Sequence, residues 1–217
     1  LNARPPILAL RRISFENPKM KVTMLNQEAL DTLFTQAHTN TVWLDKPVTN
    51  GQLRDIYELM KWAPTSMNCQ PARIAFVKSP EAKEKLAACV SAGNVQKVLT
   101  APITAIIGMD MAFPRKMPQL FPHMDAQSLF NADEKLTADT AFRNSSLQGA
   151  YFIMAARAIG LDCGPMSGFD AAKVNEAFFV GTKVQANFLC SIGYGDHEKI
   201  KPRLPRLTFE AACAIVL

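Results

Sequence analysis

The feature that most restricts the fold is a long helical pattern between Thr137 and Ile159. Apolar side chains recur at helical spacing along one face of this segment, namely at Leu147, Ala150, Tyr151, Met154 and Ala158. Its second half is apolar on nearly every side, and Gly160 provides a C-terminal stop. A helix that is apolar all round is usually buried. The pattern therefore predicts a buried central helix that also contributes to a subunit interface.

Shorter segments indicate further helices and strands around this helix. Helical patterns cover residues 25–38, 49–62, a segment that begins at Ser79 and ends before Gly93, and a segment that begins at Asp170. The second of these starts with a capping box, because Thr49 is followed three residues later by Gln52. Short apolar runs predict strands at residues 73–78, 102–108 and 187–192. Interleaved helices and strands predict an α+β fold, and the proline-rich segment 113–133 is expected to form short helical turns.

Composition and charge exclude several classes of protein. The chain has 217 residues, 48% hydrophobic and 20% charged, which fits a globular enzyme or binding domain with a sizeable core. Its net charge of +5 is scattered except between Lys199 and Arg206, which favours a phosphorylated cofactor or an acidic substrate over nucleic acid. Glycine-rich Rossmann and P-loop motifs are absent from the sequence, and no apolar run is long enough to span a bilayer.

The cysteine pattern indicates a reducing compartment. The sequence contains five cysteines without a C-x-x-C pair, and only three histidines. An odd number of unclustered cysteines argues against both a disulfide framework and a zinc site. We therefore expect a cytoplasmic protein without a metal.

Residues 1–23 differ from the rest of the chain. Arg4, Arg11 and Arg12 come before any acidic residue, and Pro5-Pro6 interrupts the short apolar run that a targeting peptide would need. We expect an N-terminal extension outside the fold, with residues 24–217 forming one domain. A role in packing on a partner subunit stays open.

A polar stretch between two prolines, Trp62 to Pro71, is the first candidate for a binding loop. Pro64 and Pro71 stiffen its ends, because proline fixes φ and lacks an N–H group. Short side chains between them can donate and accept hydrogen bonds. Such a loop suits a planar ligand rich in heteroatoms, although an ordinary connection from a helix to a strand would have the same composition.

This stretch resembles the Pro-Ser/Thr-Ser-x-Asn-x-Gln-Pro loop of the nitroreductase family of FMN enzymes. Three later stretches resemble the branch that contains the malonic semialdehyde reductases of pyrimidine breakdown: residues 140–148, residues 160–169, and Gly193-Tyr-Gly-Asp196 followed by Arg203-Leu-Pro-Arg206. The resemblance extends from about Leu25 to the C-terminus. It implies a mainly antiparallel sheet flanked by helices, in an intertwined homodimer with two FMN sites at the interface.

The resemblance also implies which residues bind FMN. One subunit contributes to each FMN site the loop residues Pro64, Thr65, Ser66 and Asn68, and the other subunit contributes the cationic segment. At the pyrimidine edge of the flavin, Asn94 and Lys97 match the family by position, and a lysine there would stabilise the negative charge of reduced flavin. The turn after the long helix, with a backbone N–H directed at flavin N5, comprises Pro165, Met166, Ser167 and Gly168.

Two further segments are implied to hold the ribityl chain and the phosphate. The first comprises His38, Thr39 and Asn40, where the family carries an arginine in the place of His38. The second is the cationic run, in which Arg203 matches the family most clearly and Lys201 and Arg206 come next. Histidine changes charge near neutral pH, so its presence implies either a weaker FMN site or other cations that compensate.

The reaction implied by the resemblance is a ping-pong hydride transfer from NADH or NADPH through FMN N5 to an acceptor. No catalytic side chain is assigned, because the cofactor performs the hydride chemistry. The branch implies 3-oxopropanoate (malonic semialdehyde) as the acceptor. Two alternatives are a broad nitroaromatic or quinone reductase and a flavin-binding protein without turnover. A hydrolase that uses Ser66 or Cys163 lacks a nucleophile-elbow motif and an evident base.

Overall fold

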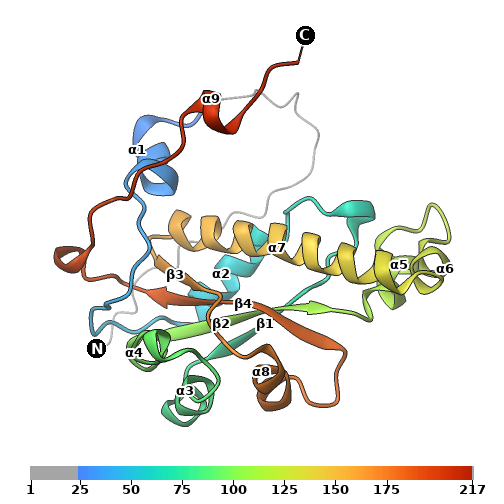
Figure 1. The fold of residues 1–217 in the computed structure, drawn as a ribbon, viewed down its shortest axis with the longest axis horizontal. Helices are drawn as coiled ribbons and strands as arrows, with labels where there is room; N and C mark the ends of the chain where they lie inside the picture. The colour runs from blue at the N-terminus through green and yellow to red at the C-terminus, as the bar shows by residue number, and fades with distance from the viewer. Residues whose placement is uncertain (1–23, 217) are drawn as a thin grey trace, which may run out of the picture.

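The structure is a computed structural model that describes residues 24–216. The prediction about residues 1–23 therefore lies outside the described residues. A four-stranded antiparallel sheet with the order β1-β2-β4-β3 forms the centre of the described chain (Figure 1). The strands are β1 (Ala72–Val77), β2 (Ile103–Asp110), β3 (Asp162–Met166) and β4 (Val184–Gly193). The predicted α+β class with an antiparallel sheet flanked by helices is confirmed.

Helices cover both faces of this sheet (Figure 1). On one face lie α2 (Asn50–Met60) and the long helix α7 (Glu134–Ala158), and on the other lie α3 (Pro80–Ala87), α4 (Ala92–Thr100) and α8 (Ala171–Phe178). Ile56, Phe152 and Ile107 belong to the core under α2 and α7. Leu86 and Leu189 belong to the core on the opposite face. Because helices cover the sheet on both sides, its central strands β2 and β4 are mostly buried and mostly apolar.

Short helices occupy the two ends of the molecule. The proline-rich region forms η3 (Phe113–Lys116), α5 (Met117–Leu120) and α6 (Ala126–Asn131), as predicted, and His123 within it is exposed. Near the N-terminus, α1 (Gln27–Leu30) and the π-helical turn η1 (Asp31–Thr35) replace the continuous helix that was predicted for residues 25–38. Three more short elements complete the described chain: η2 (Ser66–Asn68), η4 (His197–Lys199) and α9 (Phe209–Ala212).

The sequence pattern missed one strand and one helix. Residues 162–166 were expected to form a turn, but they form β3 at the edge of the sheet, where a proline such as the exposed Pro165 is tolerated. Residues 92–100 form α4, although Gly93 and Asn94 are weak helix formers. Both elements carry predicted FMN residues, so the correction fixes where those residues lie.

The predicted apolar face of α7 is only partly buried in the single chain. The helix buries its other side against the sheet, including Phe152 and the polar residues Asn144 and Gln148. Leu147 and Tyr151 remain 45% and 43% exposed. Large apolar side chains that are exposed on one face often mark a site of contact with another protein. This face of α7 is therefore available for the predicted subunit interface.

The capping box of α2 is present and yields a stability prediction. Thr49 Oγ1 accepts from the backbone N–H of Gln52, and Gln52 Oε1 accepts from that of Thr49. Thr49→Ala should lower the free energy of unfolding by about 1 kcal/mol, or Tm by about 2–4 °C. Ser91→Ala is the matched control, because Ser91 precedes α4 without a capping hydrogen bond from its side chain. Equal shifts of Tm in a thermal melt would contradict a contribution from the cap.

Candidate functional site

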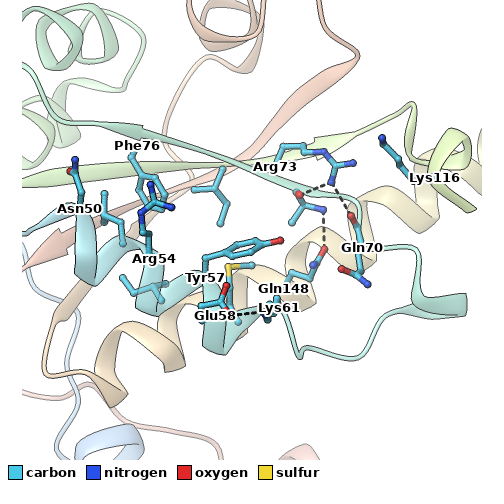
Figure 2. A pocket seen from close by; sticks show the side chains of 15 residues that line it. Asn50, Arg54, Tyr57, Glu58, Lys61, Gln70, Arg73, Phe76, Lys116 and Gln148 are labelled. Atoms are coloured by element: carbon cyan, nitrogen blue, oxygen red, sulfur yellow. Dashed lines mark hydrogen bonds and ion pairs between the residues drawn. The ribbon is translucent and has the colours of Figure 1, made fainter. Parts of the chain in front are cut away.

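The largest cavity described lies away from the predicted FMN residues. It has a volume of about 900 Å³ and runs between α2 and the edge strand β1 (Figure 2). Arg54 and Tyr57 of α2 and Arg73 and Phe76 of β1 are among the side chains that line it. None of the sixteen predicted binding residues lines it. Size alone is therefore a poor guide to the binding site in this chain.

A second cavity of about 650 Å³ collects the predicted phosphate and ribityl residues. Its walls come from Phe34 and residues 37–42, from Lys97 of α4 and Arg157 at the end of α7, and from Asp196, residues 199–204 and Arg206 after β4. The predicted residues that line it are His38, Thr39, Asn40, Lys97, Lys201, Arg203 and Arg206. The volume lies within the range of small-molecule sites. We call this space the cationic cavity.

The charge around the cationic cavity is strongly positive. Six lysine or arginine residues line it, against a single acidic residue, Asp196. Asp196 pairs with Lys199, with a distance of 3.1 Å between Oδ2 and Nζ. Arg203 donates from Nη2 to the carbonyl oxygens of Thr35 (2.8 Å) and Ala37 (3.0 Å), which brings its guanidinium next to His38. An uncompensated cluster of this kind attracts an anion such as phosphate.

Asn40 fixes the wall that carries His38 and Thr39. Its backbone N–H donates to Cys163 O (2.9 Å) in β3, and the residue is only 3% exposed. A Cβ on Gly164 would lie 2.3 Å from the backbone oxygen of Asn40, and a Cβ on Gly195 would lie 2.2 Å from its side-chain oxygen. Glycine at both positions thus allows residues 38–41 to pack closely against the end of the sheet.

A short hydrogen-bond chain connects the cationic cavity to the turn after β3. Lys97 Nζ donates to Asn94 Oδ1 (2.8 Å), and Asn94 Nδ2 donates to Gly168 O (3.0 Å). Gly168 therefore lies against Asn94 and, through it, is linked to Lys97 on α4. The other three residues predicted with Gly168 line a separate hollow of about 360 Å³ beside Phe188: Pro165 and Met166 at the end of β3, and Ser167 directly after it.

The predicted loop at residues 64–71 does not line the cationic cavity of the same chain. Pro64, Thr65, Ser66 and Asn68 lie instead beside α5 and α7, where Ser66 N donates to Asn144 Oδ1 (2.8 Å) and Asn68 Nδ2 to Leu120 O (2.9 Å). Met67, Asn68 and Gln70 have φ of 50°, 53° and 41°, and they are the only non-glycine residues with positive φ in the described chain. Such strain concentrates at binding loops.

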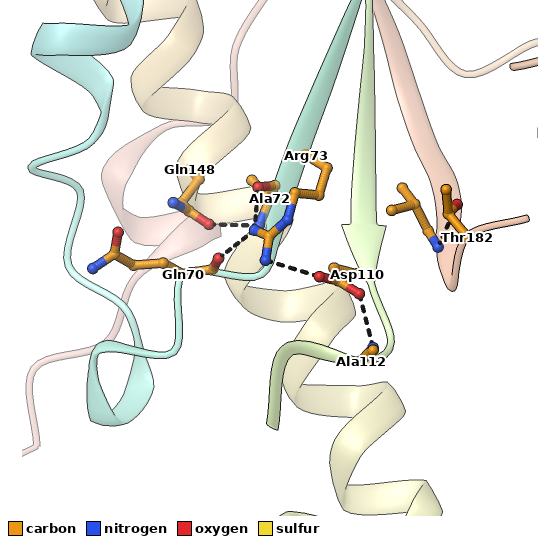
Figure 3. Close-up of polar contacts among 8 residues, drawn as sticks. Gln70, Ala72, Arg73, Asp110, Ala112, Gln148 and Thr182 are labelled. Carbon is orange, nitrogen blue, oxygen red and sulfur yellow. Dashed lines mark hydrogen bonds and ion pairs between the residues drawn. The ribbon is translucent and has the colours of Figure 1, made fainter. Parts of the chain in front are cut away.

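Hydrogen bonds anchor this loop to the start of the sheet (Figure 3). Arg73 donates from Nη1 to the carbonyl oxygens of Gln70 and Ala72, and its Nη2 lies 2.8 Å from Asp110 Oδ2. Gln148 Oε1 accepts from Ala72 N (2.9 Å). The strained loop is thus held on one side by α7 and on the other by β1 and β2.

Two functional candidates had no clear signal in the sequence. Asn144 is 2% exposed and supports the loop, although its partner is 78 residues away in the chain. Arg157 lines the cationic cavity and donates from Nη1 to Leu33 O (2.9 Å), 124 residues away. Helical periodicity placed both on α7 but carried no information about such distant partners. The one signal in the sequence was a polar residue on the face of the helix that is buried, and this signal points to Asn144 but not to Arg157.

Removal of the Asn144 side chain should loosen the loop at residues 64–71. Asn144→Ala leaves the backbone N–H of Ser66 without its acceptor, and such a loss costs about 1–3 kcal/mol. We expect a lower Tm and faster proteolysis within the loop. Asn131→Ala, at the exposed end of α6, is the control. An Asn144→Ala protein with unchanged Tm and unchanged cleavage of the loop would show that this contact does not hold it.

Two features are absent from the described residues. No helix within residues 24–216 is long and apolar enough to cross a membrane. In the same part of the chain, no group of three or more His, Cys, Asp or Glu side chains is arranged to hold a metal ion.

Comparison with known proteins identifies the family. Residues 42–195 match the nitroreductase family. A protein of Polynucleobacter asymbioticus named "Putative NADH dehydrogenase/NAD(P)H nitroreductase" is 57% identical over 194 residues, which cover 89% of this chain and 99% of that protein.

Solved structures have the same fold. One, described as a "putative nitroreductase in complex with FMN" from Exiguobacterium sibiricum, has a TM-score of 0.79 at 20% identity, over 90% of this chain and all of that one. A nitroreductase family protein from Streptococcus pneumoniae has a TM-score of 0.76 at 22% identity, over 87% and 98% of the two chains. With its family motifs, its fold and a relative of 57% identity in agreement, this chain belongs to the nitroreductase family.

Proposed function

We propose that the protein is an FMN-dependent NAD(P)H oxidoreductase that reduces 3-oxopropanoate to 3-hydroxypropanoate. The observation that carries the cofactor assignment is the cationic cavity, where seven predicted FMN residues converge. Membership of the nitroreductase family and the FMN complex of a structural neighbour support it. When bound, FMN supplies a site that accepts a hydride from NAD(P)H and passes it to the acceptor.

The donors around the cationic cavity fit a phosphorylated flavin. Lys201, Arg203 and Arg206 offer charge to a phosphate, while His38, Thr39 and Asn40 offer shorter polar groups for a ribityl chain. Lys97 and Asn94 of α4 are linked by hydrogen bonds to Gly168 and would hold the flavin ring. A lysine at that place stabilises negative charge on the reduced ring.

The substrate proposal rests on the branch that the sequence resembles. Reduction of 3-oxopropanoate consumes NAD(P)H and one proton and gives an alcohol. The substrate carries a carboxylate, which a positively charged site would attract. In this proposal the protein works in the cytoplasm, and its four buried free cysteines are compatible with a reducing compartment.

We further propose that the working form is a homodimer. The loop at residues 64–68 lies away from the cationic cavity of its own chain, so it would complete the site of a second copy. Exposed apolar side chains on α7 could provide the contact, since Phe142, Leu147 and Tyr151 are each more than 40% exposed. A stable interface of this kind buries more than about 2,000 Å² in total.

The dimer proposal predicts the effect of a charge on α7. Leu147→Glu should convert the protein to a monomer, because a buried unpaired carboxylate disfavours association. Val180→Glu, in an exposed turn before β4, is the matched control and should stay dimeric. Light scattering coupled to gel filtration reports the mass. A wild-type monomer, or a Leu147→Glu dimer, would contradict the proposed interface.

Turnover assays separate the three candidate functions. Purified FMN-loaded protein is given NADH or NADPH with 3-oxopropanoate, a nitroaromatic compound or a quinone in parallel. Selective turnover of the aldehyde supports the proposal, and brisk reduction of nitroaromatics or quinones without aldehyde turnover would replace it with a broad reductase. No oxidation of NAD(P)H with any acceptor would leave only flavin binding.

The hydrolase alternative has little support from the structure. Cys163 is completely buried in the core between the sheet and α7. Cys69, in the same loop as Ser66, is also buried, and this burial raises the pKa of its thiol to about 11. Burial thus keeps Cys163 out of reach of a substrate, and the raised pKa keeps the Cys69 thiol protonated at neutral pH.

A further inference from the structure

Arg157 has an unusual environment at the end of α7. Its Nη1 donates to Leu33 O (2.9 Å), but its Nε is buried and has no hydrogen-bond partner among the described residues. Only one other buried side-chain nitrogen in that part of the chain, Trp43 Nε1, is left in this way. A buried donor without an acceptor is costly, so it usually marks a place where a ligand or water binds.

The surroundings of Arg157 lack a compensating negative charge. No ion pair of Arg157 is found within residues 24–216, and the single acid at the cationic cavity, Asp196, is already paired with Lys199. A favourable interaction with the C-terminal end of α7 would explain a cation in the last turn of the helix. It would not explain why the guanidinium lines a cavity with an unsatisfied Nε.

Two neighbouring cations of the cationic cavity already have hydrogen-bond partners. Arg203 is engaged with two backbone carbonyl oxygens, and Lys97 with Asn94. His38 stands where the family resemblance implies an arginine. Position 38 therefore does not contribute the guanidinium group that the resemblance implies. Arg157 contributes a guanidinium group to the same cavity from α7.

We propose that Arg157 is an anion-binding residue of the cationic cavity and supplies to the FMN phosphate the charge that position 38 does not. The inference rests on the proposed FMN function. Its guanidinium would offer a phosphate oxygen a fixed positive charge and further N–H groups in one plane. The residue acts in binding and takes no part in the transfer of hydride.

Comparison of FMN with riboflavin tests this role without measuring activity. Riboflavin lacks the phosphate but shares the ring and ribityl chain. Arg157→Gln keeps an amide donor for Leu33 O and removes the charge. We expect its Kd for FMN, measured by quenching of flavin fluorescence, to rise about 10- to 100-fold, with the Kd for riboflavin nearly unchanged. Arg54→Gln, at an exposed position of α2 beside the other large cavity, should change neither value.

Each outcome has a distinct meaning. Arg157→Lys should recover part of the FMN affinity, because it restores the charge but not the planar donors. Equal weakening of FMN and riboflavin, or no weakening of either, would overturn the inference while the proposed function stands. Wild-type protein that binds neither flavin would overturn the proposed function and this inference with it.

Discussion

Gly164→Ala is expected to reduce FMN affinity at least about tenfold and to lower the free energy of unfolding by about 1–3 kcal/mol. The added Cβ would lie 2.3 Å from the backbone oxygen of Asn40, a distance that real Cβ atoms do not tolerate. The closest obstacle is backbone, so the segment at residues 38–41 has to move away from β3. This segment forms one wall of the cationic cavity, and its movement would displace His38 and Thr39.

Isothermal titration with FMN and a thermal melt measure the two effects of Gly164→Ala. Gly93→Ala is the matched control, because nothing lies within 4 Å of a Cβ at that position and α4 favours alanine. We expect the control to bind FMN normally with an equal or slightly higher Tm. A Gly164→Ala protein with the wild-type affinity would contradict the assignment of residues 38–41 to the binding site.

Arg203→Ala is expected to weaken FMN binding about 10- to 100-fold, and more than His38→Ala does. Charged hydrogen bonds contribute roughly 1.5–3 kcal/mol, against about 0.5–1.5 kcal/mol for neutral ones. Arg203 also ties the segment after β4 to the carbonyl oxygens of Thr35 and Ala37, so its loss frees one wall of the cationic cavity. Within residues 24–216, His38 takes part in one hydrogen bond, in which its carbonyl oxygen accepts from Asn40 Nδ2.

The control for Arg203→Ala and His38→Ala is the replacement of an arginine outside the cationic cavity. Arg54→Ala alters the other large cavity, between α2 and β1, and should leave FMN binding unchanged. Kd values for the three variants at one ionic strength give the comparison, since salt screens exposed charges. Equal losses for Arg203→Ala and His38→Ala would mean that the phosphate site has been misassigned.

The sequence predicted those helices and strands whose formation depends mainly on residues close together in the chain. The capping box at Thr49 and the periodicity that follows it placed α2 correctly, because both depend on neighbours within one or two turns. The edge strand β3 was missed, since Gly164 and Pro165 resemble a turn and only pairing with β4 makes them a strand. Residues 31–35 form a π-helical turn that helical periodicity cannot distinguish from an α-helix.

The candidate site could be predicted as a list of residues but not as an arrangement. Motif resemblance named Lys97, Arg203 and His38, which the fold then brings to one cavity. The roles of Asn144 and Arg157 depend on contacts with Ser66 and Leu33, and no local pattern encodes contacts over such separations. The cationic run contacts the rest of the chain through Arg203, which donates to Thr35 O, while Leu204 next to it is 76% exposed.

The most direct test of FMN binding is the visible absorption spectrum of the purified full-length protein, recorded before and after incubation with FMN and desalting. We predict a yellow protein that retains about one FMN per chain, because the cationic cavity supplies the charge that a phosphate needs. A correctly folded protein that stays colourless after desalting would contradict the assignment of the cationic cavity and, with it, the proposed enzyme.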